Sequence, residues 1–206
     1  MILDGRLLPG EQLREVPLAA LLGISRGPIR EAFRGMEEKG LVTVVKNCGV
    51  YVRTLDVEEA DQIYEVRIVL EAMIGEKVAR IITSEGLAVL NKIINNMEEA
   101  VEAADINRYT ALNFTFHDTL ASRCGNRKLH ETYQRLVAEL SLFRRQTYVH
   151  DENSLTISLA EHQAIFRAVA EGHPDEAAAL LMRHAADSRQ RLHQVLKNIP
   201  EEKSPV

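Results

Sequence analysis

The chain has 206 residues, of which 46% are hydrophobic and 27% are charged. This composition is typical of a globular protein and excludes a disordered chain. The sequence has no uninterrupted apolar run of about 18 residues, so we expect no membrane-spanning helix, and its N-terminal segment lacks the basic start and apolar stretch of a signal peptide. The two cysteines, Cys48 and Cys124, lie far apart without metal-type spacing, which predicts a reduced, cytoplasmic location.

The formal net charge of -5 is divided unevenly along the chain. Residues 1–55 hold 8 Lys and Arg against 6 Asp and Glu, whereas residues 56–206 hold 17 against 24. Contacts to DNA phosphates need cations placed along one surface rather than a basic total. The distribution of charge therefore permits a DNA-binding part at the N-terminus without requiring one.

Residues 9–53 carry the sharpest local pattern. A short apolar helix is predicted over residues 13–22; Gly23 ends it, and Ser25 begins a second helix as its N-cap. Two β-rich runs follow, residues 41–45 and 50–53, with Lys46 and Gly49 in the short segment between them. Such a pair predicts a hairpin. A hairpin directly after a recognition helix is a wing, in which a glycine can approach a sugar-phosphate backbone closely.

The predicted second helix has two unlike faces. Its apolar face consists of Ile29, Ala32, Phe33 and Met36. Its opposite face carries Arg26, Arg30 and Arg34 at intervals of four residues. Arginine can bond guanine with two hydrogen bonds in the major groove or hold a phosphate. The pattern therefore favours a DNA recognition helix, although a charged helix face is often only solvated.

Caps and apolar stripes predict six helices after residue 55. Asp56 followed by Glu59 is a capping-box-like start, and Asn126 can cap a later helix. The first predicted helix begins at residue 56. The other five cover residues 83 or 84 to about 104, 106–123, 126 to about 149, 155–171, and 174 onward. Short connections between them indicate an antiparallel bundle over residues 56–199. Residues 200–206 are expected to be a disordered tail.

Three histidines in this helical region are candidate metal ligands. His117 follows Asn113 by four residues, so both side chains share one helix face, and His162 and His184 lie in the last two predicted helices. A bundle can bring such residues together in its interior, where neutral imidazole binds zinc, nickel and similar ions. Spacing alone does not show that they converge. The remaining histidines are assigned to surface or ordinary core positions: His130, His150, His173 and His193.

The segment SRGPIREA at residues 25–32, within a longer run from PGEQL to NCGVYV, resembles the GntR family of transcription regulators. The resemblance implies a mainly α protein with an N-terminal winged helix-turn-helix domain, residues 1–55. It implies that Arg26 and Arg30 contact operator DNA and that Gly49 lies at the wing tip in the minor groove. The predicted DNA-binding set is Ser25, Arg26, Arg30, Arg34, Lys46 and Gly49. Family members usually have a full helix before PGEQL, so we expect the first helix to be largely absent here.

Residues 57–196 are similar to the FCD ligand-binding domain of the FadR branch of this family. The similarity rests on EVRIVLE at 65–71, NFTFH at 113–117, GN at 125–126, EHQAI at 161–165 and RH at 183–184. It implies a divalent transition metal, with zinc or nickel expected first, bound by Asn113, His117, His162 and His184. Asn113 stands where aspartate is more common. Its amide oxygen can bind a metal but brings no negative charge, so we expect weaker binding or a different preferred metal.

The same resemblance implies that the metal helps to hold a small carboxylate effector. Arg67 is the candidate partner for the effector, since a guanidinium group matches carboxylate geometry; the alternative is a structural ion pair with Glu65 or Glu71. Asn126 is predicted to cap a helix, with a role in the effector site as the second possibility. Arg144 and Arg145 suit either the effector site or a dimer surface.

A regulator of this kind is expected to be a homodimer on double-stranded operator DNA, because one recognition helix reads few base pairs. Two other classes of protein remain open on the sequence. A metal-dependent hydrolase would use an open metal position and a general base. Glu161 is the nearest candidate base, although beside His162 it is expected to point off the shared face. A helical adaptor that binds only protein would leave the arginine row and the wing unexplained.

Overall fold

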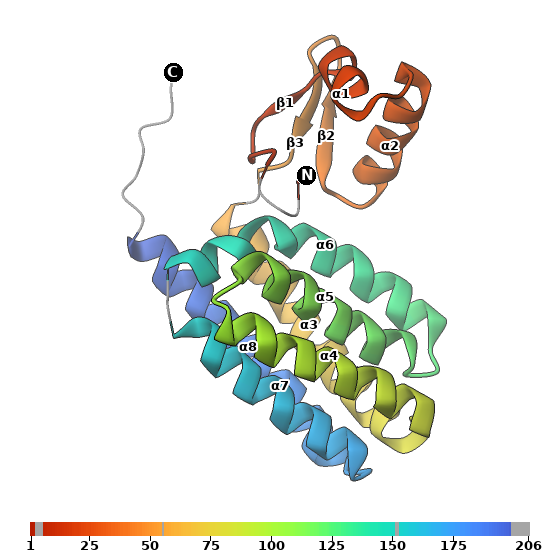
Figure 1. Ribbon diagram of the computed structural model, residues 1–206, viewed down its shortest axis with the longest axis vertical. Helices are drawn as coiled ribbons and strands as arrows, with labels where there is room; N and C mark the ends of the chain where they lie inside the picture. The colour runs from red at the N-terminus through yellow and green to blue at the C-terminus, as the bar shows by residue number, and fades with distance from the viewer. Residues whose placement is uncertain (3–5, 55, 151–152, 199–206) are drawn as a thin grey trace.

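The computed structural model describes residues 1–2, 6–54, 56–150 and 153–198, and their side chains apart from those of 141–150 and 196–198. The predicted tail and the side chains of His150, Arg144 and Arg145 lie outside this described part. Two parts are seen in Figure 1: a small mixed α and β part that contains the N-terminus, and a bundle of long helices. The mainly α fold expected from the sequence is confirmed.

The N-terminal part is a winged helix-turn-helix. Its elements are β1 (Gln12–Leu13), α1 (Glu15–Leu22), α2 (Arg26–Glu38), β2 (Val42–Val45) and β3 (Gly49–Val52). The strands form one antiparallel sheet in the order β1-β3-β2. Before β1, the described residues 1–2 and 6–11 contain no helix. The hairpin predicted between β2 and β3 is confirmed.

The predicted start of α1 was wrong by two residues. Leu13 pairs with Val50 of β3 instead of opening the helix, which begins at Glu15. Leu13 is buried by this pairing, so its apolar character reflects the sheet. A two-residue strand is too short for hydrophobic alternation to reveal it.

Helix α2 packs through the face predicted for it, with one exception. Ile29 and Phe33 are buried in a small apolar core with Leu41, Val42 and Val52 of the sheet region. Ala32 is exposed instead. It lines a mainly apolar pocket of about 630 Å³ that α2 shares with α5 of the bundle.

The bundle consists of six helices, as predicted. They are α3 (Val57–Ile81), α4 (Ser84–Glu102), α5 (Ile106–Ser122), α6 (Arg127–His150), α7 (Ser154–Ala170) and α8 (Pro174–Asn198). The expected caps form: Asp56 accepts a hydrogen bond from the Glu59 amide at 2.7 Å, and Thr83 accepts one from the Gly86 amide at 3.2 Å. Satisfied first-turn amides fix where these helices begin.

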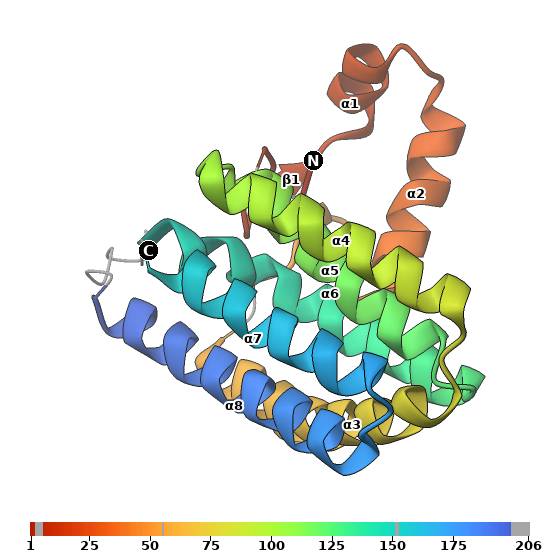
Figure 2. The same ribbon diagram turned by 60° about the horizontal axis from the view of Figure 1, so that its bottom comes forward.

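Buried apolar side chains from all six helices form the interior of the bundle. Helices α3 and α8 lie side by side along most of their length, on the side of the bundle away from α1 and α2 in Figure 2. They approach closely at Gly75 of α3, where a Cβ atom would lie 2.7 Å from the carbonyl oxygen of Ala177 in α8. No helix in the described residues is both long enough and apolar enough to span a membrane.

One arginine connects the winged part to the bundle. Arg53, just after β3, forms ion pairs with Glu139 of α6 (2.7 Å) and with Glu59 of α3. Its guanidinium group also donates to the carbonyl oxygen of Gly40, in the turn that follows α2 (3.5 Å). The position of the recognition helix is therefore fixed partly by side chains of the bundle.

The close approach of α3 and α8 gives a testable prediction. Gly75→Ala should lower the free energy of unfolding by about 1–3 kcal/mol, because the added methyl group forces the two backbones apart. Gly35→Ala in α2 is the matched control. A Cβ there meets nothing within 4 Å, and alanine is about 0.5–1 kcal/mol more favourable than glycine inside a helix.

The measurement is thermal and urea unfolding followed by circular dichroism. If Gly75→Ala proves as stable as Gly35→Ala, the close α3–α8 contact is contradicted.

Candidate DNA-binding surface and metal centre

Two of the three arginines on the outer face of α2 lie against α1. Arg26 Nε is 3.1 Å from one carboxylate oxygen of Glu15, and Arg30 Nε is 2.7 Å from the other. The hydrogen bond from Arg30 is the largest influence on Glu15 and lowers the pKa of its carboxyl group. Both arginine side chains remain more than half exposed, at 57% and 56%. They are therefore held in place at the surface while still open to a partner.

The other predicted DNA-contacting residues are also at the surface. Arg34 pairs with Glu31 one turn away and is 75% exposed. Ser25 occupies the N-cap position of α2, as predicted, but its hydroxyl makes no capping hydrogen bond. Lys46 is exposed at the turn between β2 and β3.

The backbone conformation at the start of β3 requires a glycine at position 49, which Gly49 provides. Its φ of +124° lies in a region that side-chain-bearing residues rarely adopt, and a Cβ would lie 2.9 Å from Gln12 Nε2. Gln12 Nε2 in turn donates to the carbonyl oxygen of Cys48 at 2.8 Å. The glycine thus shapes the wing, whatever the wing contacts.

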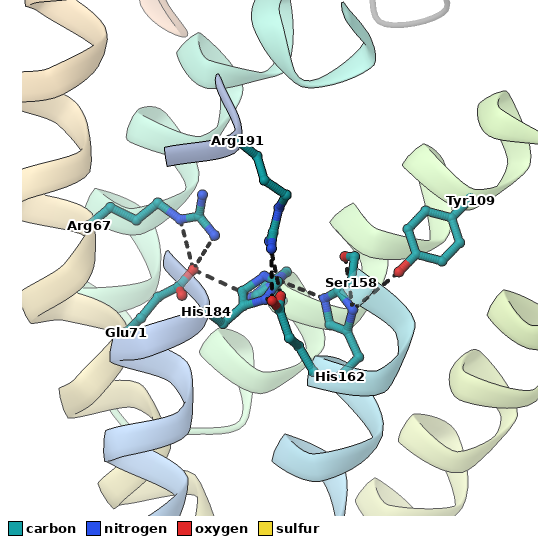
Figure 3. Close-up of polar contacts among 9 residues, drawn as sticks. Arg67, Glu71, Tyr109, Ser158, His162, His184 and Arg191 are labelled. Carbon is teal, nitrogen blue, oxygen red and sulfur yellow. Dashed lines mark hydrogen bonds and ion pairs between the residues drawn. The ribbon is translucent and has the colours of Figure 1, made fainter. Parts of the chain in front are cut away.

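The three candidate histidines converge inside the bundle. His117 comes from α5, His162 from α7 and His184 from α8, and the three are 2%, 0% and 2% exposed. One potential ligand atom from each lies within 4.8 Å of the others. Figure 3 shows the labelled His162 and His184 side by side, with polar side chains from other helices around them. Helices far apart in the sequence thus bring together what spacing alone did not.

The three Nε2 atoms face one another. His117 Nε2 is 3.1 Å from His184 Nε2 and 3.1 Å from His162 Nε2. The Nδ1 atoms point outward: His117 Nδ1 is 3.4 Å from Glu71 Oε1, and His184 Nδ1 is 2.6 Å from Glu161 Oε2. An ionised carboxylate only accepts hydrogen bonds, so the bond to Glu161 places a proton on His184 Nδ1, whereas the His117 ring only lies beside Glu71. His184 Nε2 then holds a lone pair directed at the shared centre.

The third imidazole has neutral outer partners. His162 Nδ1 lies 3.4 Å from the Tyr109 hydroxyl and 3.5 Å from the Ser158 hydroxyl. A hydroxyl can accept the Nδ1 proton or donate its own to Nδ1, so these contacts suit either tautomer of His162. Phe116 packs edge-on against the His162 ring, with ring centroids 4.9 Å apart. The triad is thus oriented by polar contacts on its outside and by aromatic packing beside it.

These distances fit a divalent metal. Zinc binds imidazole nitrogen at about 2.0–2.1 Å, so two nitrogens on one ion lie about 2.9 Å apart at a right angle and about 3.3–3.4 Å apart at a tetrahedral angle. The observed 3.1 Å lies between these values. Glu71 and Glu161 occupy the outer positions from which carboxylates commonly orient metal-bound imidazoles. The three histidines are therefore suited to hold an ion, with Nε2 as the ligand atom of each.

The fourth predicted ligand lies on the same face of α5. Asn113 is one helical turn before His117 and is 1% exposed. Its place and burial agree with the expectation from sequence. Among the described residues, the cluster of potential ligands contains the three histidines and no carboxylate.

Arg67 is completely buried and pairs with Glu71, one of the two alternatives left open by the sequence. Its Nε donates to Glu71 Oε1 at 2.8 Å, and its Nη2 lies 2.7 Å from the same oxygen without hydrogen-bond alignment. Burial is the largest influence on Arg67 and lowers its pKa, but Glu71, Tyr133 and Tyr64 together outweigh burial, so the pKa lies above its ordinary value. Nη1 has no acceptor in the described structure. A buried guanidinium with unused donors is able to receive an anion.

Tyr133 of α6 also reaches this pair, because its hydroxyl donates to Glu71 Oε1 at 2.6 Å. Glu71 Oε1 therefore accepts hydrogen bonds from both Arg67 and Tyr133, and it lies beside His117. Figure 3 shows Arg67 and Glu71 on one side of the histidines, with Tyr109 and Ser158 on the other. The carboxylate of Glu71 links the buried arginine to the predicted metal ligands.

Some residues named in the sequence analysis have a structural role here, and others near the site were missed. Asn126 caps α6, accepting the Leu129 amide at 3.1 Å, which was the first of its two predicted roles. Glu161 does leave the ligand face, as expected, but it bonds His184 and receives both terminal nitrogens of Arg191 at 2.8 and 2.9 Å. The sequence analysis did not place Glu71, Tyr109, Ser158 or Tyr133 around the three histidines. The carboxylates Glu71 and Glu161 can be read from the sequence, but the helices that they face cannot.

The remaining described histidines form separate contacts. His130 pairs with Asp118 at 2.8 Å, and His193 pairs with Asp61 at 2.7 Å. His173 is half exposed beside Glu171 and Glu176. None of the three belongs to the buried cluster.

The fold and the site together define a class of protein: a winged DNA-binding part joined to a helical domain with a buried polar site. Comparison with known families agrees. Residues 1–52 match the family described as bacterial regulatory proteins, gntR family, and residues 62–187 match the FCD domain. The chain belongs to the GntR family of transcription regulators, in the branch that carries an FCD domain.

Individual relatives support the same assignment. An uncharacterized HTH-type transcriptional regulator, YdhC of Bacillus subtilis, is 31% identical over 96% of this chain and 88% of its own length. The Nta operon transcriptional regulator of Aminobacter aminovorans is 31% identical over 85% of this chain and 81% of its own. The solved structure of Escherichia coli McbR/YncC has the same fold, with a TM-score of 0.85 over 94% of this chain and 92% of its own, at 21% identity.

The protein is therefore a DNA-binding transcription regulator and not an enzyme. The hydrolase alternative and the protein-only adaptor are both excluded by this assignment. Glu161 agrees with that conclusion, because it is engaged with His184 and Arg191.

The outer carboxylate on His184 gives a prediction. Glu161→Gln should weaken zinc binding by about 10- to 100-fold, because it removes the charge that orients His184 and raises its basicity. Glu171→Gln is the matched control, since it removes a carboxylate beside the exposed His173. Competition with a chromophoric zinc chelator measures both affinities. Equal affinities for the two variants would show that Glu161 does not support the site.

Proposed function

We propose that the helical domain binds one divalent transition metal, zinc or nickel first, through Asn113, His117, His162 and His184. The observation that carries this proposal is the convergence of three buried histidines, in which His117 Nε2 lies 3.1 Å from Nε2 of each of the other two. A carboxylate lies beside the outer Nδ1 atom of two of the rings, which supports Nε2 as the ligand atom. When bound, the ion supplies a positive centre that can hold an oxygen atom of an effector.

The effector is a small carboxylate, held by the metal and by Arg67. Arg67 is completely buried and has unused donors on Nη1. Leaving buried donors of a charged group unbonded costs about 1–3 kcal/mol or more, which an effector oxygen would recover. Asn126 was also predicted to contact the effector; its side-chain oxygen is engaged in capping α6, so Arg67 is the main effector residue of the proposal.

DNA binding is assigned to the outer face of α2 and the wing. The contacting residues are Ser25, Arg26, Arg30, Arg34, Lys46 and Gly49. Their exposure and shared placement on the winged part support this assignment. We assign residues 1–55 to the DNA-binding domain and 56–199 to the effector-binding and dimerisation domain. The protein acts as a homodimer in the cytoplasm, because a palindromic operator needs two recognition helices.

Elemental analysis of the purified protein tests the metal site. We expect about one zinc or nickel per chain in the unaltered protein and a sharp loss in His117→Ala, His162→Ala and His184→Ala. His173→Ala, which alters an exposed histidine, should keep its metal. A parallel thermal-shift screen should show carboxylates raising the melting temperature only when metal is present.

No bound metal, together with no change in melting temperature on addition of zinc or nickel, would contradict the proposal. The DNA-binding function would stand in that case.

A substitution in α2 tests the DNA-binding surface. Arg30→Ala should weaken binding to an operator selected from randomised DNA by about 1–3 kcal/mol if the residue bonds a base. Arg80→Ala removes the same charge from an exposed, ion-paired position on α3 and should change affinity far less. Fluorescence anisotropy at fixed salt measures both. Equal losses would reject a specific contact by Arg30.

A further inference from the structure

An exposed arginine lies between β1 and α1 of the winged part. Arg14 occupies the N-cap position of α1, but its side chain makes no capping hydrogen bond. Serine, threonine, aspartate and asparagine stabilise this position, because their short side chains accept a hydrogen bond from a first-turn amide. The chain thus has a long cation where a short polar residue would stabilise the helix more.

The side chain of Gln12 holds this arginine and connects it to the wing. Arg14 Nε donates a hydrogen bond to Gln12 Oε1 at 3.1 Å. Gln12 Nε2 donates to the carbonyl oxygen of Cys48, in the turn between β2 and β3, at 2.8 Å. Because Arg14 is bonded through Nε, both of its terminal nitrogens remain available, and neither bonds another described residue.

Arg14 differs from the arginines of α2 in the charge of its partner. Arg26 and Arg30 share the carboxylate of Glu15, which offsets part of their charge. Arg14 is held by a neutral amide and forms no ion pair with a described residue. Its positive charge is therefore uncompensated at the surface. An exposed guanidinium group of this kind is suited to a phosphate oxygen.

The contacts of Arg14 place it between the two elements assigned to DNA. On one side Gln12 connects it to the wing; on the other, the next residue, Glu15, contacts the recognition helix. Neighbouring major and minor grooves are separated by one sugar-phosphate backbone. A protein with a helix in one groove and a wing in the other must cross that backbone, as the first helix of a helix-turn-helix does. A cation between the two elements lies where the phosphates pass.

We propose that Arg14 binds a phosphate of the backbone between the groove that receives α2 and the groove that receives the wing, and that Gln12 positions it. This inference rests on the DNA-binding surface of the proposed function and adds a contact outside the six residues assigned there. The contact contributes affinity without sequence preference, because every base pair carries the same phosphates.

Fluorescence anisotropy with the full chain tests the contact on two duplexes: an operator selected from randomised DNA, and a scrambled duplex of the same composition. Arg14→Ala should weaken binding to both by the same factor, about three- to tenfold at about 0.1 M salt. It should also reduce the slope of log affinity against log salt concentration by about one. Arg80→Ala, which removes an exposed arginine from α3, is the control and should change neither quantity.

A second substitution separates DNA binding from folding. Serine at position 14 can cap α1, so Arg14→Ser should raise the melting temperature by about 2–4 °C. It should nevertheless bind both duplexes as weakly as Arg14→Ala. A purely structural role of Arg14 would not produce a variant that is more stable and binds less tightly.

The role of Gln12 is tested in combination with Arg14. Gln12→Met removes both hydrogen bonds of the amide at similar side-chain length. It should weaken binding in the unaltered protein but have far less effect in Arg14→Ala, because Gln12 acts through Arg14. Likewise, a neutral methylphosphonate in place of the contacted phosphate should weaken binding by the unaltered protein and not by Arg14→Ala.

Three results would overturn the inference: an unchanged affinity and salt slope in Arg14→Ala, a loss confined to the operator, or full DNA affinity in Arg14→Ser. An equal effect of Gln12→Met in the presence and absence of Arg14 would reject the positioning role of Gln12. Failure of the unaltered protein to select any operator is a different result, because it contradicts the DNA-binding surface of the proposed function and with it this contact.

Discussion

Three imidazole nitrogens that all present lone pairs to one another repel unless a cation lies between them. The contact of His117 Nε2 with His184 Nε2 at 3.1 Å illustrates the constraint. A carboxylate lies beside Nδ1 of each ring, at 3.4 Å from His117 and 2.6 Å from His184; two neutral rings that both keep their proton on Nδ1 have none to share at this contact. A proton added to one ring could bridge one pair of nitrogens, whereas a metal ion satisfies all three together.

This centre depends on contacts that reach across the bundle. Helices α5, α7 and α8 provide the rings, while α3 provides Glu71 and α7 provides Glu161. Helix α6 contributes Tyr133, whose hydroxyl holds Glu71. Further along, α6 carries Glu139, which pairs with Arg53 of the winged part. One helix thus contacts both the surroundings of the buried site and the connection to the DNA-binding part, and a displacement of α6 would alter both contacts.

The sequence predicted the elements well because their signals are local. Asp56, Thr83 and Asn126 mark helix starts through hydrogen bonds to amides three residues away. The four-residue spacing of Asn113 and His117 likewise fixed their common face. Strand β1 was missed because its evidence is a pairing with β3, far along the chain. Local patterns do not contain such pairings.

The site was predicted less completely than the fold, for the same reason. Resemblance to the FCD domain singled out the three histidines, but only the packing of three helices showed that their Nε2 atoms converge. The outer partners Glu71 and Glu161 depend on which helices face one another. The pairing of Arg26 and Arg30 with Glu15 depends on the angle between α1 and α2, which the arginine spacing does not determine.

X-ray absorption spectroscopy of the zinc- or nickel-loaded protein tests the central claim most directly. The account predicts three imidazole nitrogens at about 2.0–2.1 Å from the ion, with the remaining positions filled by oxygen, and the loss of one imidazole in His162→Ala. An ion with one imidazole or none in the unaltered protein, or a spectrum that His162→Ala leaves unchanged, would show that the buried histidines do not form the metal centre.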